Sequence, residues 1–194
     1  MLLPSPRTKG RISVEEAISS RRSRREFRDK PLSLEELAQL LWAAQGTVLP
    51  RGMRTAPSAG ATFPLEIYAV VGNVAETSSG LYHYNTFNHS LEKLSGEDLR
   101  RRLASAALGQ MMISSAPLSL VIAADFARTV NRYGHRAVQY VNNEVGHVGQ
   151  NIYLQCEALG LGTCAVGAFR EEEVQALLKI DQVPLYIMPV GYVR

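Results

Sequence analysis

Residues 117–125, with the sequence PLSLVIAAD, form a continuous apolar run that restricts the folds open to this chain. A run of this kind is typical of a β-strand that is buried on both faces. Such a strand belongs to a sheet that other elements cover on each side. The elements expected around it show no regular βαβ alternation, because helices come first, a hairpin lies in the middle and a strand ends the chain. We therefore predict an α+β fold, with an antiparallel or mixed sheet flanked by helices.

Local signals place the other elements. Two S-x-x-E capping boxes, SVEE at 13–16 and SLEE at 33–36, predict helices that begin at Val14 and Leu34. The first helix should end near Ser20, and Gly46 should end the second. Ser95 is the expected cap of a third helix. The remaining expected elements are strands at 65–71, 80–85, 89–94 and 184–193, and helices at 136–159 and 171–180.

Composition limits the classes of function. The length of 194 residues suits one domain, 1–194, and the net charge is only +3. The positive charge is local, because residues 1–30 hold nine Lys and Arg against four Asp and Glu. This unevenness weighs against a nucleic-acid partner, which requires a broad basic face. The two cysteines and four histidines lack metal-ligand spacing. The N-terminus lacks a signal-like apolar run and no segment suits a membrane span, so we expect a cytoplasmic protein.

The segment ISSRRSRREF, residues 18–27, gathers four arginines around one serine. The guanidinium groups of arginines and a serine hydroxyl are suited to binding a phosphate. In an extended segment, Arg21, Ser23 and Arg25 would face one way, and Arg22 and Arg24 the other. Three interpretations remain open: a solvated helix end, a nucleic-acid patch, or a socket for one small anion.

Two further segments are unusually rich in small residues, APSAGA at 56–61 and GLGTCAVGAF at 160–169. Small side chains allow a backbone to approach a flat ligand closely. The first segment is equally consistent with a plain loop before a strand, and the second with a helix C-cap and a tight strand entry. The chain has no G-x-G-x-x-G after a strand, no P-loop and no G-x-S-x-G nucleophile elbow.

Taken in order, these three segments and the terminal YIMPVG resemble the nitroreductase family, and most closely its SagB-type branch. The resemblance spans roughly residues 12–192. It implies an α+β fold and an intertwined, obligate homodimer with one FMN per site across the interface. It also implies that NADH or NADPH supplies a hydride, which passes through the flavin to a second substrate. Because the flavin carries this chemistry, no protein nucleophile or acid–base pair is required.

The resemblance assigns roles residue by residue. Arg21 and Ser23 match the residues that hold the FMN phosphate, and Arg25 matches the basic residue at the pyrimidine edge. The backbone of Val166 and Gly167 matches the segment beside the reactive edge of the flavin, so no side chain is assigned as catalytic. The other positions matched to cofactor binding are Arg22, Gln150 on the dimer helix, Cys164, Ala165, Arg194, and the loop Pro57, Ser58, Ala59 and Gly60, which the other subunit supplies.

Substrate is expected on the exposed flavin face, in a pocket closed partly by residues near 128–140. Tyr133 and Tyr140 are candidates to line that pocket, although either could equally be a core aromatic. Arg24 and Arg28 have no assigned role and are expected to face solvent.

The resulting hypothesis is an FMN-dependent NAD(P)H oxidoreductase that reduces small acceptors such as nitroaromatics, quinones or free flavin. Two alternatives remain. One is a SagB-type azoline dehydrogenase that acts on a modified peptide together with partner proteins. The other is a flavin-binding or flavin-storage protein with little turnover. All three exclude nucleic acid and membranes as partners.

Overall fold

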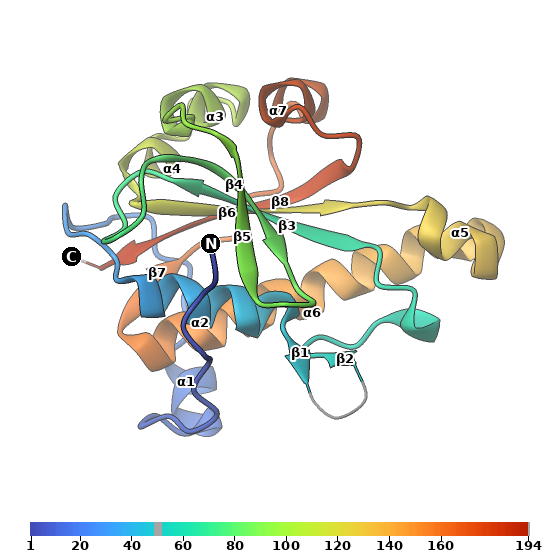
Figure 1. The fold of residues 1–194 in the computed structure, drawn as a ribbon, viewed down its shortest axis with the longest axis horizontal. Helices are drawn as coiled ribbons and strands as arrows, with labels where there is room; N and C mark the ends of the chain where they lie inside the picture. Colours follow the sequence, from blue (N-terminus) through green and yellow to red (C-terminus); the bar gives the residue numbers. More distant parts are fainter. Residues whose placement is uncertain (49–51, 194) are drawn as a thin grey trace.

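A six-stranded sheet lies between two layers of helices (Figure 1). The computed structural model describes residues 1–48 and 52–193. The helices are α1 (Val14–Ser20), α2 (Leu34–Gln45), α3 (Arg100–Ala106), α4 (Met111–Ser115), α5 (Ala127–Tyr133), α6 (Ala137–Leu159) and α7 (Glu171–Leu178), with short 3-10 turns η1 (Ala59–Ala61) and η2 (Gly134–Arg136). The strands are β1 (Thr47–Val48), β2 (Met53–Arg54), β3 (Leu65–Val71), β4 (Gly80–Asn85), β5 (Ser90–Ser95), β6 (Leu118–Ala124), β7 (Leu161–Thr163) and β8 (Val183–Tyr192).

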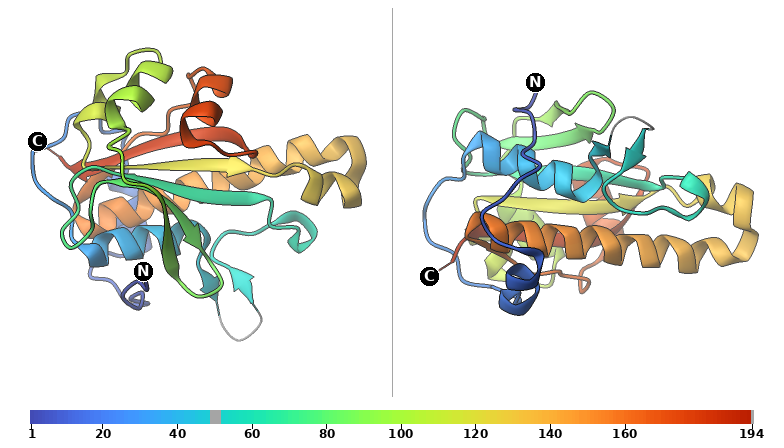
Figure 2. Two further views of the ribbon diagram at one scale, coloured as in Figure 1. Left: turned by 45° about the horizontal axis from the view of Figure 1, so that its top comes forward. Right: turned by 90° about the horizontal axis from the view of Figure 1, so that it is seen from below.

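Strand β6 occupies the interior of this sheet, in the order β5-β4-β3-β6-β8-β7. All seven of its residues are buried, which confirms the strand predicted from the apolar run. Leu120 and Ile122 belong to the core cluster formed with α2 and α6, whereas Val121 and Ala123 belong to the cluster formed with α3 and α7. The views in Figure 2 show these helices on opposite faces of the sheet. The predicted α+β sheet flanked by helices is therefore confirmed.

The two capping boxes begin their helices where the sequence predicted. Ser13 Oγ accepts a hydrogen bond from Glu16 N at 3.1 Å, and Glu16 Oε2 accepts one from Ser13 N at 2.7 Å. Ser33 and Glu36 repeat this reciprocal pair at the start of α2. These bonds satisfy N–H groups that would otherwise lack partners in the first turn.

The prediction that Ser95 caps a helix is wrong. Ser95 is the last residue of β5, where it pairs with Leu81 across the hairpin. Its hydroxyl accepts a hydrogen bond from Glu97 N, and α3 begins only at Arg100. The strand pairing therefore outweighs the local capping signal. The hairpin itself forms as predicted, although β5 begins at Ser90 rather than at His89.

Helix α6 packs against one face of the sheet beside α2, and most of the predicted site residues lie near it (Figure 2). Its 23 residues correspond to about 35 Å at 1.5 Å per residue. Gly160 ends the helix in the left-handed conformation, with φ +70°, and β7 follows at once. In the described part of the chain, no helix combines the length and the apolar character needed to cross a membrane.

The two edges of the sheet are both met by N-terminal segments of the chain. Leu2 forms an antiparallel bridge with Ser90 of β5. At the opposite edge, Ser23 forms a parallel bridge with Thr163 of β7. The arginine-rich segment is therefore fixed by the sheet rather than projecting freely.

Candidate functional site

The arginine-rich segment leaves α1 and lies along β7. Arg21 is the C-cap of α1, and its backbone is already out of the helical region, with φ −56° and ψ 125°. Ser23 then bridges Thr163, and Arg24 N donates to Thr163 O at 2.8 Å. A segment that leaves a helix and joins a strand edge holds its side chains in a fixed alternation.

Arg21 and Ser23 share one partner, Tyr153 of α6. The Arg21 guanidinium carbon lies 5.2 Å from the centre of the Tyr153 ring, a cation–π arrangement. Ser23 Oγ lies 2.9 Å from Tyr153 Oη. The common contact supports the predicted alternation, in which Arg21 and Ser23 face the same side.

The other arginines of the segment lie differently. Arg22, Arg25 and Arg28 are exposed, but Arg24 is half-buried, contrary to the expectation that it faces solvent. The stem of Arg24 lies against Gly162, where an added Cβ would come within 2.7 Å of Arg24 Cβ. Within residues 1–48 and 52–193, no ion pair involves any of the arginines from 21 to 28. These cations are therefore free to meet an anionic ligand.

The segment after β7 meets the arginine segment at the same tyrosine. Ala165 N donates a hydrogen bond to Tyr153 Oη at 2.8 Å. Val166 pairs with Ile187 of β8 through two backbone hydrogen bonds, of 2.9 and 3.0 Å, so its N–H is already used. Gly167 is exposed, and its N–H has no hydrogen bond to the described residues. Of the two backbone groups predicted at the reactive edge, only that of Gly167 remains able to donate.

The thiol of Cys164 is buried. Its side chain is only 2% exposed, and it forms no disulfide with Cys156, which is also buried. Tyr153, in contrast, is a site residue that the sequence analysis missed. The sequence holds no local signal for its role, because its hydroxyl contacts residues 130 and 12 positions away.

The predicted loop Pro57–Gly60 lies near the other half of α6, beside α5 (Figure 1). Ser58 Oγ accepts a hydrogen bond from Phe63 N at 2.9 Å, which folds the loop back on itself. Gly60 adopts φ +59°, a conformation that favours glycine. An added Cβ there would come within 2.5 Å of Tyr133 Oη.

Helix α5 anchors this loop through a series of bonds. Arg128 Nη1 donates to Phe63 O at 3.0 Å, and Arg132 Nη1 donates to Gly60 O at 3.2 Å. The hydroxyls of Thr62 and Thr129 lie 2.9 Å apart. Because the bonds are spread over most of α5, the loop and the helix form one unit.

An ion pair ties α5 to the sheet. Arg128 Nη2 lies 2.7 Å from Glu66 Oε1 of β3. Burial by itself raises the pKa of Glu66, but hydrogen bonds from His83 and Arg128 outweigh burial, so the pKa is lowered overall. Glu66 therefore remains ionised and holds the base of α5 in place at neutral pH.

A cavity of about 260 Å³ lies between this loop and α6. Both the loop and the predicted substrate tyrosine Tyr140 contribute to its wall. Tyr140 packs edge-on against Tyr133, with ring centres 4.9 Å apart and an interplanar angle of 80°. The residues that line the cavity are Pro57, Ser58 and Ala59 from the loop, and Tyr140, Asn143, Glu144 and His147 from α6.

Glu144 is the buried titratable group of this cavity, and the sequence analysis missed it. Its side chain accepts a hydrogen bond from Gln45 Nε2 at 3.3 Å. Gln45 in turn accepts one from Arg54 Nη1 at 3.1 Å, so this arginine is joined to Glu144 only through a neutral amide. Burial raises the pKa of Glu144, and hydrogen bonds from Ser58 and Gln45 oppose this only in part.

The predicted residues thus form two groups along α6. The arginine segment and residues 164–167 meet at Tyr153, whereas the loop meets α6 around Tyr140. Thirteen residues separate these tyrosines, which is about 20 Å along the helix axis. Gln150 lies between the two groups and is exposed. Arg194, also predicted to bind the cofactor, lies outside the described residues.

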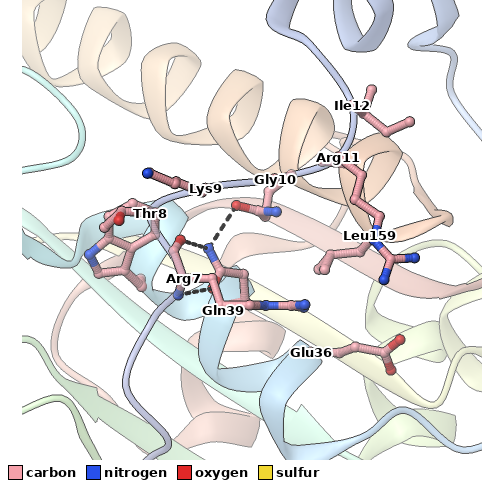
Figure 3. A pocket seen from close by; sticks show the side chains of 12 residues that line it. Arg7, Thr8, Lys9, Gly10, Arg11, Ile12, Glu36, Gln39 and Leu159 are labelled. Atoms are coloured by element: carbon pink, nitrogen blue, oxygen red, sulfur yellow. Dashed lines mark hydrogen bonds between the residues drawn. The ribbon is translucent and has the colours of Figure 1, made fainter.

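A larger cavity, of about 580 Å³, contains none of the predicted residues (Figure 3). It lies between the N-terminal segment, α2 and the end of α6. Gln39 fastens the N-terminal segment there, because it accepts from Arg7 N at 2.8 Å and donates to Arg7 O at 3.0 Å. Gln39 Nε2 also donates to Gln155 Oε1 at 3.1 Å, so its amide group is fully used.

Comparison with known proteins places these features in context. The model of the nitroreductase family matches residues 18–192. A candidate nitroreductase of Methanocaldococcus jannaschii is 48% identical over 93% of this chain and 91% of its own. The crystal structure of a candidate nitroreductase from Ralstonia eutropha superposes with a TM-score of 0.87, at 30% identity over 100% of this chain and 89% of that chain. The microcin B17-processing protein McbC of Escherichia coli is 25% identical over 87% of this chain, which spans 65% of McbC.

Proposed function

Because this chain belongs to the nitroreductase family, we propose that it is an FMN-dependent oxidoreductase that transfers a hydride from NADH or NADPH to a small acceptor. One observation carries the proposal. Tyr153 contacts both Arg21 and Ser23 and also holds the backbone of Ala165. Two segments that are matched to flavin binding, and that contain Ser23 and Ala165, 142 positions apart in the sequence, therefore lie side by side.

The residues at this position suit a phosphate and a flat ring. Arg21 and Ser23 present a guanidinium and a hydroxyl on one side of the segment, and Arg21 has no competing carboxylate among the described residues. Paired donors of this type bind phosphate oxygens. Arg25 would meet the pyrimidine edge, and the Gly167 N–H would face the reactive edge. FMN, when bound there, supplies the hydride chemistry, and the protein supplies the position of the cofactor and the electrostatic field around it.

A second copy of the chain would complete the site. The loop Pro57–Gly60 lies about 20 Å along α6 from Tyr153, so one copy does not bring it to its own arginine segment. Apolar side chains on α1 also lack cover in the single chain, since Val14 is 64% exposed and Ile18 is 56% exposed. Exposed apolar patches of this kind mark association surfaces. We therefore propose a homodimer in which each loop covers the flavin of the partner subunit.

The size of the cavity beside the loop is consistent with a small acceptor. Its volume of about 260 Å³ lies just below the range of ~300–1,000 Å³ common for small-molecule sites, so the acceptor would have to be small. Tyr140 offers an aromatic face to a nitroaromatic or a quinone. The name of McbC, a microcin B17-processing protein, supports peptide azoline oxidation as a second candidate. A flavin-storage role would instead require binding with little turnover.

A flavin titration tests the central claim. The purified protein should show a flavin spectrum or bind added FMN. Arg21→Ala should weaken FMN binding by roughly 10- to 150-fold, since a hydrogen bond to a charged group contributes about 1.5–3 kcal/mol. Arg28→Ala removes an exposed cation just beyond the same segment and should leave affinity unchanged. A folded wild-type protein that binds no FMN would refute the proposal.

The same samples separate the candidate activities. NADH and then NADPH should bleach the flavin of the wild-type protein, and a nitroaromatic or a quinone should restore its colour. Bleaching without reoxidation by either acceptor would favour the peptide substrate. Binding without bleaching would favour storage.

A further inference from the structure

Glu144 is a buried carboxyl group in the cavity assigned to the acceptor, yet hydride transfer does not use it. Its side chain is 2% exposed, in the first half of α6. Its hydrogen bond comes from a neutral group, the Gln45 amide, at 3.3 Å. No ion pair forms with it among residues 1–48 and 52–193. A buried carboxyl with only neutral partners costs the protein stability when ionised, so a function for it is worth seeking.

The charged groups that face Glu144 are few. Arg54 of β2 reaches it only through Gln45, and His147 stands one turn away on α6. Both favour the ionised form, but burial is the larger effect. Glu144 therefore retains its proton to a higher pH than an exposed glutamate.

Reduction of a quinone or a nitro compound consumes a proton as well as a hydride, and a protein acid can accelerate that proton transfer. A hydride brings two electrons and one proton to a quinone, and the second oxygen must then take up one more proton to give the hydroquinone. A positioned acid in a closed cavity can supply it without waiting for water. Of the groups in this wall, Glu144 is the carboxyl, and it adjoins both the loop and Tyr140.

We propose that Glu144 is a catalytic acid that gives the acceptor its second proton. The inference rests on the proposed function, because it places the acceptor in the cavity beside the loop. The O–H bond of the Glu144 carboxyl breaks as an O–H bond forms on the quinone, and the hydride supplied originally by NAD(P)H accounts for both electrons. The carboxylate then recovers a proton from solvent. His147 lines the same cavity and is exposed, so it offers a route for that proton.

Two variants separate this role from a structural one. Glu144→Gln keeps a side chain of the same size that can still bond Gln45 or Ser58, but it carries no acidic proton. Glu144→Ala removes both the hydrogen-bonding group and the acidic proton. Glu172→Gln, on the exposed surface of α7, is the matched control for loss of one carboxylate.

The rates of flavin reduction by NADPH and of flavin reoxidation are measured separately, with 1,4-benzoquinone as the acceptor. In Glu144→Gln, FMN affinity and flavin reduction by NADPH should match wild type, whereas reoxidation by the quinone should slow by at least about 100-fold. The wild-type reoxidation rate should fall as the pH rises and Glu144 loses its proton, and the Glu144→Gln rate should lack this dependence. If Glu144→Gln reoxidises like wild type and only Glu144→Ala is slow, Glu144 is an anchor for the loop and the proposal is wrong.

A second readout needs no turnover. Infrared difference spectra of the flavin-free protein, wild type minus Glu144→Gln, should contain the carbonyl band of a protonated carboxyl at a pH where exposed glutamates, with pKa about 4.3, have ionised. A band that vanishes together with those of the exposed glutamates would overturn the proposal. A wild-type protein that fails to bind FMN would refute the proposed function itself, before any variant is made.

Discussion

Replacing Tyr153 with phenylalanine removes one oxygen atom that contacts both flavin-matched segments. That oxygen accepts a hydrogen bond from Ala165 N at 2.8 Å and lies 2.9 Å from Ser23 Oγ. The ring stays in place, so the stacking of Arg21 over it, at 5.2 Å, is retained. The substitution therefore tests the hydroxyl without opening a cavity in the packing.

The magnitude follows from the two groups left behind. Ala165 is half-buried, so its N–H loses an acceptor that water replaces poorly, at a cost of about 1–3 kcal/mol. Ser23 is exposed and can bond to water instead, so its loss adds little. We expect a net decrease in the free energy of unfolding of about 1–2 kcal/mol. For a domain of this size, 1 kcal/mol shifts Tm by about 2–4 °C, so Tm should fall by about 2–8 °C.

Thermal unfolding followed by circular dichroism, without added flavin, measures this change directly. Tyr133→Phe is the matched control, because the Tyr133 hydroxyl has no hydrogen bond to the described residues. FMN affinity should fall about fivefold in Tyr153→Phe, because Ser23 loses the partner that orients it and one hydrogen bond contributes about 1 kcal/mol. A Tm within about 1 °C of both wild type and the control, with unchanged FMN affinity, would refute the reasoning.

Three further substitutions test other parts of the structure. Gly162→Ala places a Cβ 2.7 Å from Arg24 Cβ, so it should push the arginine segment off β7 and lower both Tm and FMN affinity, measured on one sample. Arg128→Met should lower the free energy of unfolding in urea by about 1–2 kcal/mol at pH 7. Burial raises the pKa of Glu66, but its hydrogen bonds outweigh burial and lower it overall, so this contribution is present at neutral pH. The difference in the free energy of unfolding between wild type and Arg128→Met should shrink as the pH falls and Glu66 protonates. A difference that does not depend on pH would argue against the ion pair. Glu144→Gln should gain stability over wild type as the pH rises, because burial raises the pKa of Glu144 and penalises only the ionised form. Equal melting curves of the two proteins at pH 4 and pH 8 would contradict that.

Local sequence signals predicted the elements well where the decisive contacts are local. The bonds of the capping box at Ser13 and Glu16 span three residues, and the helix begins where the pattern says. Ser95 carries a similar signal, but its backbone pairs with Leu81, and that pairing decides its conformation. A local sequence pattern does not show which residues of the two strands of a hairpin pair with each other.

The same distinction holds for the site. Arg21 and Ser23 stand out because like residues gather in one short segment. Tyr153 and Glu144 do not, because their partners lie far away in the sequence: Ser23 is 130 residues from Tyr153, and Gln45 is 99 residues from Glu144. Both residues lie on α6, whose helical period was predictable, but only the folded chain shows which side chains meet it.

The bridge between Ser23 and Thr163 also bears on how the protein avoids aggregation. Strand β7 is the outer strand of the sheet, and the unpaired backbone groups of an outer strand can recruit a strand from another molecule. The arginine-rich segment occupies that edge, where Arg24 N donates to Thr163 O, and its charged side chains disfavour the addition of a further strand there. The segment matched to phosphate binding thus also covers an edge strand that could otherwise pair with another molecule. Removing it would expose β7 to intermolecular pairing, so a chain that begins after residue 26 should precipitate even when flavin is absent from the experiment.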